Sequence, residues 1–358
     1  MISWRLYLIL GTVAVAMLLV ACGSSATPTL APVNTTAQST TEASGPAAFT
    51  PVTLESCSAT TSSDAAVEVG KISFTYTEPP SRAITLNQHA TEIMLALGLE
   101  DRMVGTAYID DQILTEYRAA YNSIPVLAEE YPSKEVILAQ EPDFIYGGFS
   151  SSFRDEVAGT QADLKGLGIG SYLTVAICEE ETADTLEDVY TDIRNVGKIF
   201  GVSDRAEVLL ASLQQDIGHI QTILDSSILD TAGTPLRVFM YDSGDDAPFA
   251  ATCCSMFSNL IETVGGENIF DDVNSRWSTV SWEEVIQRDP EVIVLTEAVW
   301  STSQQKIDLL LSNPAYADIT AVKDRRFVSL QFSSMVPGIR NATAIRELAE
   351  GIYPDLFP

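Results

Sequence analysis

The feature that most restricts the fold is a phrase that this chain of 358 residues contains twice. SKEVILAQEPDFIYGG begins at Ser133, and SWEEVIQRDPEVIVLTE begins at Ser281. Each phrase reads as a short amphipathic helix followed by an apolar strand. Aligned without a gap, Ser133, Glu135, Pro142 and Ile145 of the first phrase fall on Ser281, Glu283, Pro290 and Ile293 of the second. A chain that repeats one helix-strand step at distant positions is predicted to build two similar lobes.

The sequence around both phrases alternates strands and helices. Helical spacing predicts helices at 90–97, 256–264, 281–287 and 342–352, and Gly98 is placed to end the first of them. Such alternation indicates an α/β fold with mostly parallel central sheets. Short apolar runs predict the strands at 84–86, 104–108, 144–146, 169–174, 237–241, 292–296 and 326–330.

The segment between the two halves has a purely helical pattern. Apolar residues within 186–200 follow helical spacing, and Thr185 with Asp188 supplies a capping pair. A glycine interrupts the pattern, and a second apolar series runs from Ala206 to Leu224. A helix of about 20 residues spans about 30 Å, which is the length of a strut between two lobes.

The N-terminus has the pattern of an export signal. A basic residue at Arg5 is followed by an apolar run over 6–20, shorter than the roughly 20 residues of a membrane-spanning helix. The motif Leu-Val-Ala-Cys, which ends at Cys22, resembles the bacterial lipobox, whose cysteine is lipidated; the alternative is an ordinary secretory signal. Residues 23–50 are nearly all Ser, Thr, Ala, Pro and Gly, which predicts a flexible tether.

Charge and cysteine content limit the partners and the chemistry. The chain has 49 acidic against 20 basic residues, a net charge of −29, which argues against a nucleic-acid partner. Outside the cytoplasm, the remaining cysteines are candidates for disulfides. Cys57 with Cys178 is the natural long-range pair, and the adjacent Cys253 and Cys254 either pair with each other or stay free. Neither cysteine nor histidine has the spacing of a metal site, so we expect no cofactor and no resident metal.

Five motifs, in order along the chain, resemble one protein family. The resemblance is to the substrate-binding lipoproteins of ABC importers for ferric siderophores, haem and cobalamin, the class III periplasmic binding proteins. It covers about residues 80–354. It implies two Rossmann-like α/β lobes joined by one long helix, a ligand cleft between the lobes, and binding rather than catalysis. The motifs are PSRAITLNQHATEIMLALGLEDRMVGTA, SKEVILAQEPDFIY, LIETVGGENIFDD, SWEEVIQRDPEVIVL and AVKDRRFVSL.

These patterns predict the organisation and the partners of the chain. We expect a monomer, lipid-anchored to the outer face of the cytoplasmic membrane, that delivers a small-molecule chelate to an ABC permease dimer with its ATPase. The expected segments are a signal peptide with lipobox at 1–22, a flexible tether and N-terminal segment at 23–79, an N-terminal lobe at 80–182, a linker helix region at 183–228 and a C-terminal lobe at 229–358.

The resemblance also implies a role for the repeated acids. In the family, one glutamate on the outer face of each lobe contacts arginine pockets of the two permease subunits, and by position these are Glu135 and Glu283. The structural alternative is that acids in a first helical turn interact favourably with the helix dipole, by about 0.3–1 kcal/mol. Glu284, which can form a capping box with Ser281, is the more structural acid.

Candidate ligand-binding residues follow from the rule that open α/β lobes bind ligands at the carboxyl ends of their strands. The arginines suit the oxygens of an anionic chelate, and the aromatic residues suit apolar walls unless they belong to the lobe cores. His89 suits a metal centre or a hydrogen bond, unless it is a capping or solvated residue. The set is Asn87, Gln88, His89, Tyr108, Phe149, Asp242, Arg276, Trp277, Phe332 and Arg340, with Asp110 and Glu297 in the same loops.

Several other functions remain as alternatives. A rigid strut favours a bulky, rigid ligand, so a ferric siderophore is expected first and a corrinoid or another macrocycle second. The pairs Asp110-Asp111, Asp245-Asp246 and Cys253-Cys254 leave open a neutral or partly cationic ligand. The same lobes could serve a signalling receptor. Zinc and manganese receptors need several histidines, and this chain has two. A hydrolase with Cys254 or Ser255 as nucleophile and His89 as base lacks a Gly-x-Ser-x-Gly elbow, so we expect no enzyme.

Overall fold

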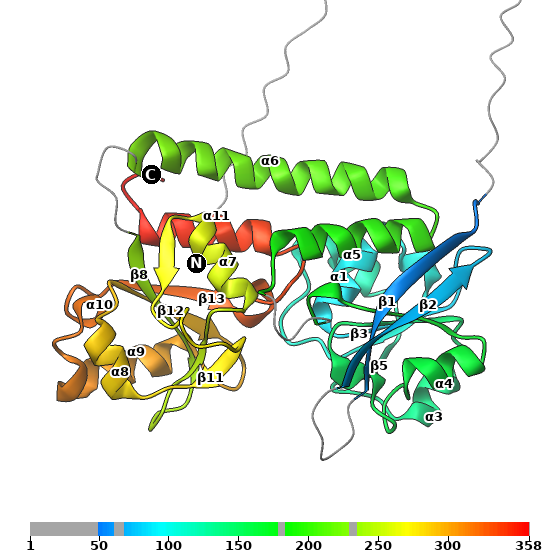
Figure 1. The fold of residues 1–358 in the computed structure, drawn as a ribbon, viewed down its shortest axis with the longest axis horizontal. Helices are drawn as coiled ribbons and strands as arrows, with labels where there is room; N and C mark the ends of the chain where they lie inside the picture. The colour runs from blue at the N-terminus through cyan, green and yellow to red at the C-terminus, as the bar shows by residue number, and fades with distance from the viewer. Residues whose placement is uncertain (1–48, 61–67, 178–182, 229–234, 358) are drawn as a thin grey trace, which may run out of the picture. The chain divides into compact units, whose positions relative to one another are not determined.

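The computed structural model describes residues 49–60, 68–177, 183–228 and 235–357. It confirms the predicted fold class, because two central sheets lie side by side with helices packed around each (Figure 1).

The sheet of the N-terminal lobe has five strands in the order β5-β4-β3-β6-β7, all parallel to one another. All four residues of β3, with the sequence AITL, are buried, as expected for a parallel strand covered on both faces. The elements of this lobe are β3 (Ala83–Leu86), α1 (Gln88–Ala96), β4 (Met103–Ala107), α2 (Arg118–Tyr121), β5 (Val126–Ala128), α3 (Lys134–Leu138), β6 (Phe144–Gly147), α4 (Gln161–Gly166) and β7 (Gly170–Leu173).

The sheet of the C-terminal lobe has six strands in the order β11-β9-β8-β12-β13, with β10 paired to β8. Its centre is parallel, whereas β9 and β11 are antiparallel additions at one edge. The elements are β8 (Leu236–Ser243), β9 (Phe249–Ala251), α7 (Met256–Thr263), β10 (Gly266–Asn268), β11 (Trp277–Thr279), α8 (Trp282–Arg288), β12 (Val292–Glu297), α9 (Ser303–Ser312), α10 (Thr320–Lys323), β13 (Phe327–Gln331) and α11 (Asn341–Ile352).

The repeated phrase occupies equivalent places in the two sheets. The first copy forms α3 and β6, and the second forms α8 and β12. Strand β6 pairs with β3, the first strand of its lobe, and β12 pairs with β8, the first strand of the other. The repeat is therefore the step that places the second central strand beside the first.

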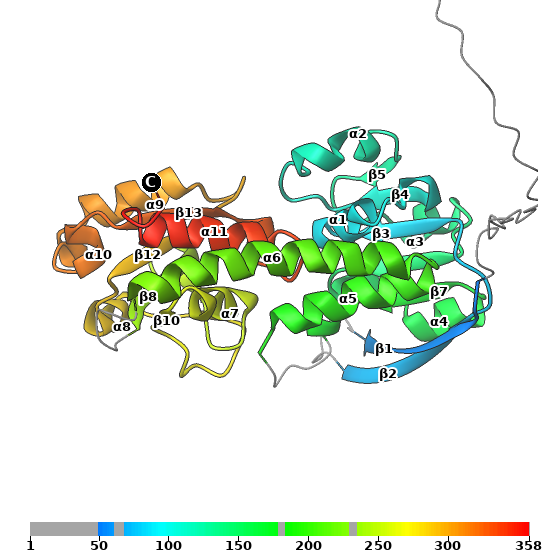
Figure 2. The ribbon, with the colours of Figure 1, turned by 90° about the horizontal axis from the view of Figure 1, so that it is seen from above.

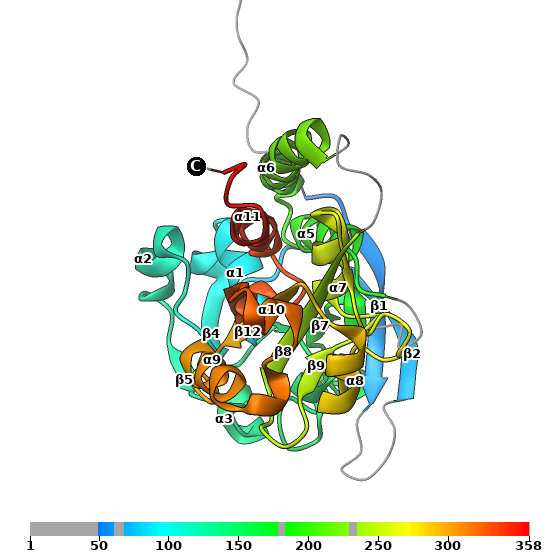
Figure 3. The ribbon, with the colours of Figure 1, turned by 90° about the vertical axis from the view of Figure 1, so that its left-hand side faces the viewer.

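Two consecutive helices connect the lobes. α5 (Leu186–Ile199) begins with the capping box that Thr185 and Asp188 predicted. α6 (Ser203–Ile228) has 26 residues and therefore spans about 39 Å. α6 runs along both lobes, packed against α5 at one end and against α11 at the other (Figure 2). Seen from the side of the C-terminal lobe, α11 lies between α6 and the sheet (Figure 3).

A two-stranded antiparallel sheet precedes the N-terminal lobe and was not predicted from the sequence. It consists of β1 (Val52–Thr60) and β2 (Glu68–Tyr76). The Tyr76 hydroxyl donates to the Ser171 carbonyl of β7 at 3.3 Å, which holds the hairpin against the lobe. Cys57 of β1 is buried and disulfide-bonded. Its expected partner Cys178 and the expected lipidated Cys22 both lie outside the described residues.

Within the described ranges, no helix combines the length and the apolar character that crossing a bilayer requires.

Candidate functional site

The carboxyl ends of the central strands meet at a hollow of about 330 Å³ with walls from both lobes. Five of its eight lining residues are aromatic, so we call it the aromatic compartment. Ring centroids of Tyr108 and Tyr131 are 4.6 Å apart on the N-terminal lobe, and those of Trp300 and Phe332 are 5.2 Å apart on the C-terminal lobe. The lining residues are Asn87, Tyr108, Asp110, Tyr131, Phe149, Ser151, Trp300 and Phe332.

Asn87 forms part of the wall and carries a donor without a partner. It directly follows β3, is 0% exposed and has a φ of 80°. Its Oδ1 accepts hydrogen bonds from the Tyr131 hydroxyl and from Ser152 Oγ, both at 3.0 Å. Among the residues that the structure describes, its Nδ2 has no hydrogen-bond partner. A positive φ at a non-glycine residue costs free energy, and residues with this conformation concentrate at binding sites. Tyr108, with a φ of 60°, also has a positive φ.

A second hollow of about 870 Å³ shares Asp110 with the first. Three carboxylates and two guanidinium groups line it, and we call it the acidic compartment. Burial, with a smaller contribution from Asp111, raises the pKa of Asp110 to about 6. Its lining residues are Ile109, Asp110, Asp111, Gln112, Ile113, Leu114, Thr115, Arg118, Glu297, Ala298, Val299, Thr302, Gln331 and Arg340.

Arg340 lies at the acidic compartment but is bound to the other lobe. Its Nε and Nη2 donate to the two carboxylate oxygens of Glu92 at 2.7 and 2.6 Å, and Nη2 also donates to the Gln112 carbonyl at 2.6 Å. Arg340 is 7% exposed and Glu92 is 1% exposed. A second contact joins the lobes nearby, because the Ser333 amide donates to Asp111 Oδ2 at 2.9 Å. Arg340 thus serves as an interlobe contact, which its sequence could not reveal.

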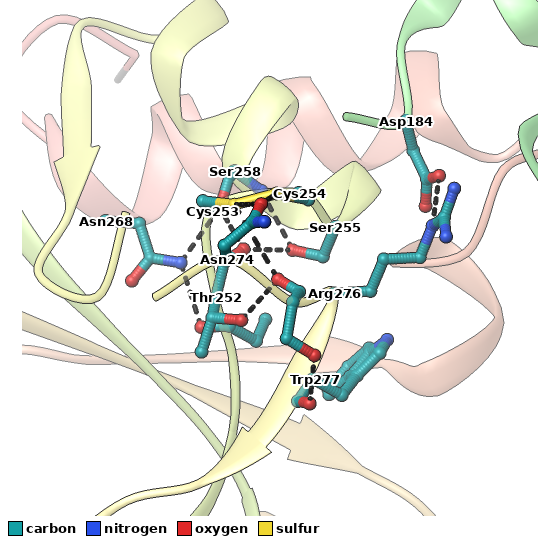
Figure 4. Close-up of a disulfide and its surroundings, with 12 residues drawn as sticks. Asp184, Thr252, Cys253, Cys254, Ser255, Ser258, Asn268, Asn274, Arg276 and Trp277 are labelled. Carbon is teal, nitrogen blue, oxygen red and sulfur yellow. Dashed lines mark hydrogen bonds and ion pairs between the residues drawn. A yellow bond between two sulfur atoms is a disulfide. The ribbon is translucent and has the colours of Figure 1, made fainter. Parts of the chain in front are cut away.

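Arg276 is likewise held by an ion pair, with Asp184 (Figure 4). Its Nε donates to Asp184 Oδ1 at 2.7 Å, and it also donates to the Ala176 carbonyl. Despite this ion pair, burial raises the pKa of Asp184 to about 6. The adjacent Cys253 and Cys254 form a disulfide, one of the two states that the sequence left open. The Cys254 carbonyl accepts a hydrogen bond from the Asp184 amide at 3.0 Å, so the disulfide lies beside the segment that leads into α5.

Other candidates from the sequence are buried and line neither hollow. His89 is 3% exposed, and burial, opposed by a hydrogen bond with the Gly148 backbone, lowers its pKa to about 4. A Cβ at Gly148 would collide with the His89 ring. Gln88 is buried and accepts a hydrogen bond from the Asp111 amide at 2.7 Å, which positions the acidic compartment. Asp242 is buried and accepts from Ser243 Oγ.

Trp277 lies on β11, where its ring stacks on Phe249 with centroids 5.8 Å apart. It does not line either compartment. Tyr131 and Trp300 line the aromatic compartment, and sequence reasoning missed both. Trp300 follows the end of β12, the position that the strand-end rule describes, whereas Tyr131 follows β5, a strand that the sequence pattern did not predict.

The repeated acids lie on exposed helix starts, away from both compartments. Glu135 is in the first turn of α3, and Glu283 is in the first turn of α8. A hydrogen bond from the Ser133 side chain lowers the pKa of Glu135. Ser281 caps α8 by accepting from the Glu284 amide at 3.2 Å, but its own amide does not donate to the Glu284 side chain, so only half of the expected capping box forms. In the described ranges, no group of three or more His, Cys, Asp or Glu side chains could hold a metal ion.

Comparison with known proteins gives concordant matches. The family model described as periplasmic binding protein matches residues 84–333. An uncharacterized ABC transporter substrate-binding lipoprotein of Bacillus subtilis is 26% identical over 284 residues, 79% of this chain and 83% of the relative. A vitamin B12-binding protein of Pectobacterium atrosepticum is 28% identical over 234 residues, 62% of this chain and 76% of the relative.

Solved structures with the same fold cover most of the chain. A periplasmic binding protein from Veillonella parvula has a TM-score of 0.74 and 31% identity, covering 85% of this chain and 99% of its own. A protein of an ABC-type Fe³⁺-hydroxamate transport system from Saccharomonospora viridis has a TM-score of 0.65 and 26% identity, covering 79% of this chain and 96% of its own.

Proposed function

The chain belongs to the periplasmic binding protein family, and we propose that it is the extracytoplasmic receptor of an ABC importer for a bulky metal chelate. The observation that carries the proposal is the aromatic compartment, because its walls come from both lobes and meet at the carboxyl ends of both sheets. These aromatic side chains give the compartment a broad apolar wall, which suits the apolar body of a bulky chelate.

The interlobe contacts support a bulky ligand. The Glu92–Arg340 pair and the Asp111–Ser333 hydrogen bond join the lobes directly, and α6 packs along both. A cleft held in this way is largely preformed, so it does not close tightly around a small solute. The two compartments, of about 330 and 870 Å³, share a wall at Asp110 and together suit one large ligand.

Ferric siderophores are the first ligand candidates and corrinoids are the second. The Fe³⁺-hydroxamate relative supports the first choice, and the vitamin B12-binding relative supports the second. A hydrolase is disfavoured because its proposed nucleophiles are engaged elsewhere: Cys254 is bonded to Cys253, and Ser255 Oγ caps α7 and donates to the Thr252 carbonyl.

The binding experiment uses the mature domain with three chelates, a ferric trihydroxamate, haem and cyanocobalamin, each titrated by calorimetry. Intrinsic tryptophan fluorescence locates the ligand, because Trp300 is 52% exposed at the aromatic compartment. We expect one chelate to bind at micromolar affinity or better, and Trp300→Phe to remove most of the quenching. Trp277→Phe, a tryptophan outside the compartments, is the matched control. Binding of free Fe³⁺ or a monosaccharide, with none of the chelates bound, would overturn the proposal.

The lipobox motif supports lipid anchoring at Cys22, which lies outside the described residues. Cys22→Ala should leave the protein soluble or unprocessed, and labelling with a radioactive fatty acid should disappear. Unchanged membrane association after this substitution would contradict the lipid anchor.

A further inference from the structure

The cleft of this protein is negatively charged, contrary to what an anionic chelate would need. Its acidic compartment contains the carboxylates of Asp110, Asp111 and Glu297. Glu297 accepts a hydrogen bond from the Ser303 amide at 2.8 Å, and this bond, first among the causes, lowers its pKa and keeps it ionised. The aromatic compartment has Asp110 as its only charged lining residue among those described.

The two arginines of the compartment offset at most one of these three charges. Arg340 is paired with Glu92, so the pair contributes no net charge. Arg118 also lines the compartment but is exposed, and it contacts the Gln112 side chain at 3.4 Å, so one positive charge faces three carboxylates. Arg276, the other arginine suited by sequence to an anionic ligand, forms its ion pair with Asp184 outside both compartments. No guanidinium group among the described residues is therefore available deep in the cleft for a carboxylate or catecholate.

A second, independent observation identifies the other end of the ligand. The buried Asn87 lines the aromatic compartment, and its amide donor has no partner among the described residues. A buried donor without an acceptor costs about 1–3 kcal/mol, which a ligand carbonyl oxygen would recover. Hydroxamate and amide groups supply such oxygens. The faces of Tyr108 and Trp300 are also favourable neighbours for positive charge.

We propose that the cleft selects a chelate with carbonyl-type oxygens at Asn87 and a positively charged group at the carboxylates of Asp110, Asp111 and Glu297. The inference rests on the proposed function and extends it to the charge of the ligand. The sequence left both an anionic chelate and a neutral or partly cationic ligand open, and the inference selects the cationic one. A ferric trihydroxamate that bears a free amine has this chemistry, and so does a corrinoid with a positive charge on cobalt.

Two series of ligands, each with one body and varied charge, test the proposal. The first is a linear ferric trihydroxamate with a free amine, its N-acetyl derivative and its N-succinyl derivative, which are cationic, neutral and anionic. The second is aquacobalamin, cyanocobalamin and a cyanocobalamin monocarboxylate, with the same three charges. Calorimetry is run at 150 mM salt, where long-range attraction is screened. In the series that binds, we expect the affinity to fall about tenfold from the cationic to the neutral member and about tenfold again from the neutral to the anionic member. Each step corresponds to the interaction of two unit charges about 6 Å apart at an intermediate dielectric constant.

Variants assign the effect to the cleft. Asp110→Asn should lower the ratio of the affinity for the cationic member to the affinity for the neutral member several-fold, and an unchanged circular dichroism spectrum shows that the variant is folded. Asp318→Asn removes the same charge from an exposed position outside both compartments and should leave the preference unchanged.

The pH dependence gives a further readout. Because the pKa of Asp110 is about 6, its negative charge is lost as the pH falls from 7.5 to 5. Affinity for the cationic member should fall over this range, and affinity for the neutral member should stay constant. In Asp110→Asn, the affinity for the cationic member should no longer fall over this pH range. The titratable and charged groups that share the walls with Asp110 are Tyr108, Tyr131, Asp111, Arg118, Glu297 and Arg340.

The outcomes separate the inference from the proposed function. If an anionic member binds as tightly as its cationic counterpart, the charge selectivity is wrong and the chelate receptor stands. If haem and every member of both series fail to bind, the receptor proposal fails, and the charge inference fails with it.

Discussion

The Glu92–Arg340 pair gives the sharpest test of how the cleft is held. Glu92→Gln keeps the shape of the side chain and removes its charge, which leaves the Arg340 guanidinium without its carboxylate. Breaking a buried ion pair from one side costs about 3–5 kcal/mol. Two features reduce this cost. The Leu114 amide donates to Glu92 Oε1 at 3.2 Å, and the side-chain oxygen of the new glutamine can still accept this hydrogen bond. Arg340 also borders the acidic compartment. We therefore expect a loss of about 2–3 kcal/mol in the free energy of unfolding.

Urea unfolding followed by both circular dichroism and fluorescence measures this loss, provided that the two signals give one coincident transition. The matched control is Glu55→Gln, which breaks the Lys71–Glu55 pair whose side chains are 73% and 56% exposed. It should cost less than about 1 kcal/mol. A loss for Glu92→Gln no greater than that of the control would refute the reasoning that this pair holds the lobes together.

The double variant Glu92→Gln with Arg340→Gln adds a second check. Removing both charges leaves no unpaired buried ion, so most of the lost stability should return. The affinity for the chelate should nevertheless stay reduced, because the lobes lose the contact that sets the width of the cleft. Full recovery of affinity together with stability would show that the pair does not position the lobes.

Two further predictions concern docking and pH. Replacing both Glu135 and Glu283 with Ala should abolish chelate uptake by cells and leave the affinity for the chelate in solution intact. The charge-matched double variant Glu262→Ala with Glu350→Ala should retain uptake. A loss of affinity in the first double variant would contradict the docking role. Burial raises the pKa of Asp192 to about 7, so the folded protein holds this proton longer than the unfolded chain, whose aspartate pKa is about 3.9. Stability should therefore contain a contribution that falls as the pH rises from about 4 to 7, and Asp192→Asn should remove that slope in urea titrations; an unchanged slope would show that Asp192 is ionised throughout.

Local patterns were sufficient to predict the fold. The buried run of β3, the capping box at the start of α5 and the long apolar series of α6 are each specified by neighbouring residues, and the structure contains all three. The hairpin of β1 and β2 was missed, because its two strands are stabilised by pairing with each other and by contacts with β7. Such pairing is not visible in the periodicity of either strand alone.

The strand-end rule selected Asn87, Tyr108, Phe149 and Phe332, and the structure brings these four residues into one compartment. Sequence alone determined that these residues follow strands, because each strand is a local apolar run. Only the tertiary structure decided which charges the cleft offers to a ligand. Arg340 looked available for an anion because its partner, Glu92, lies 248 positions away along the chain. A buried charge is paired according to proximity in the folded protein, and no local pattern encodes a contact between residues so far apart.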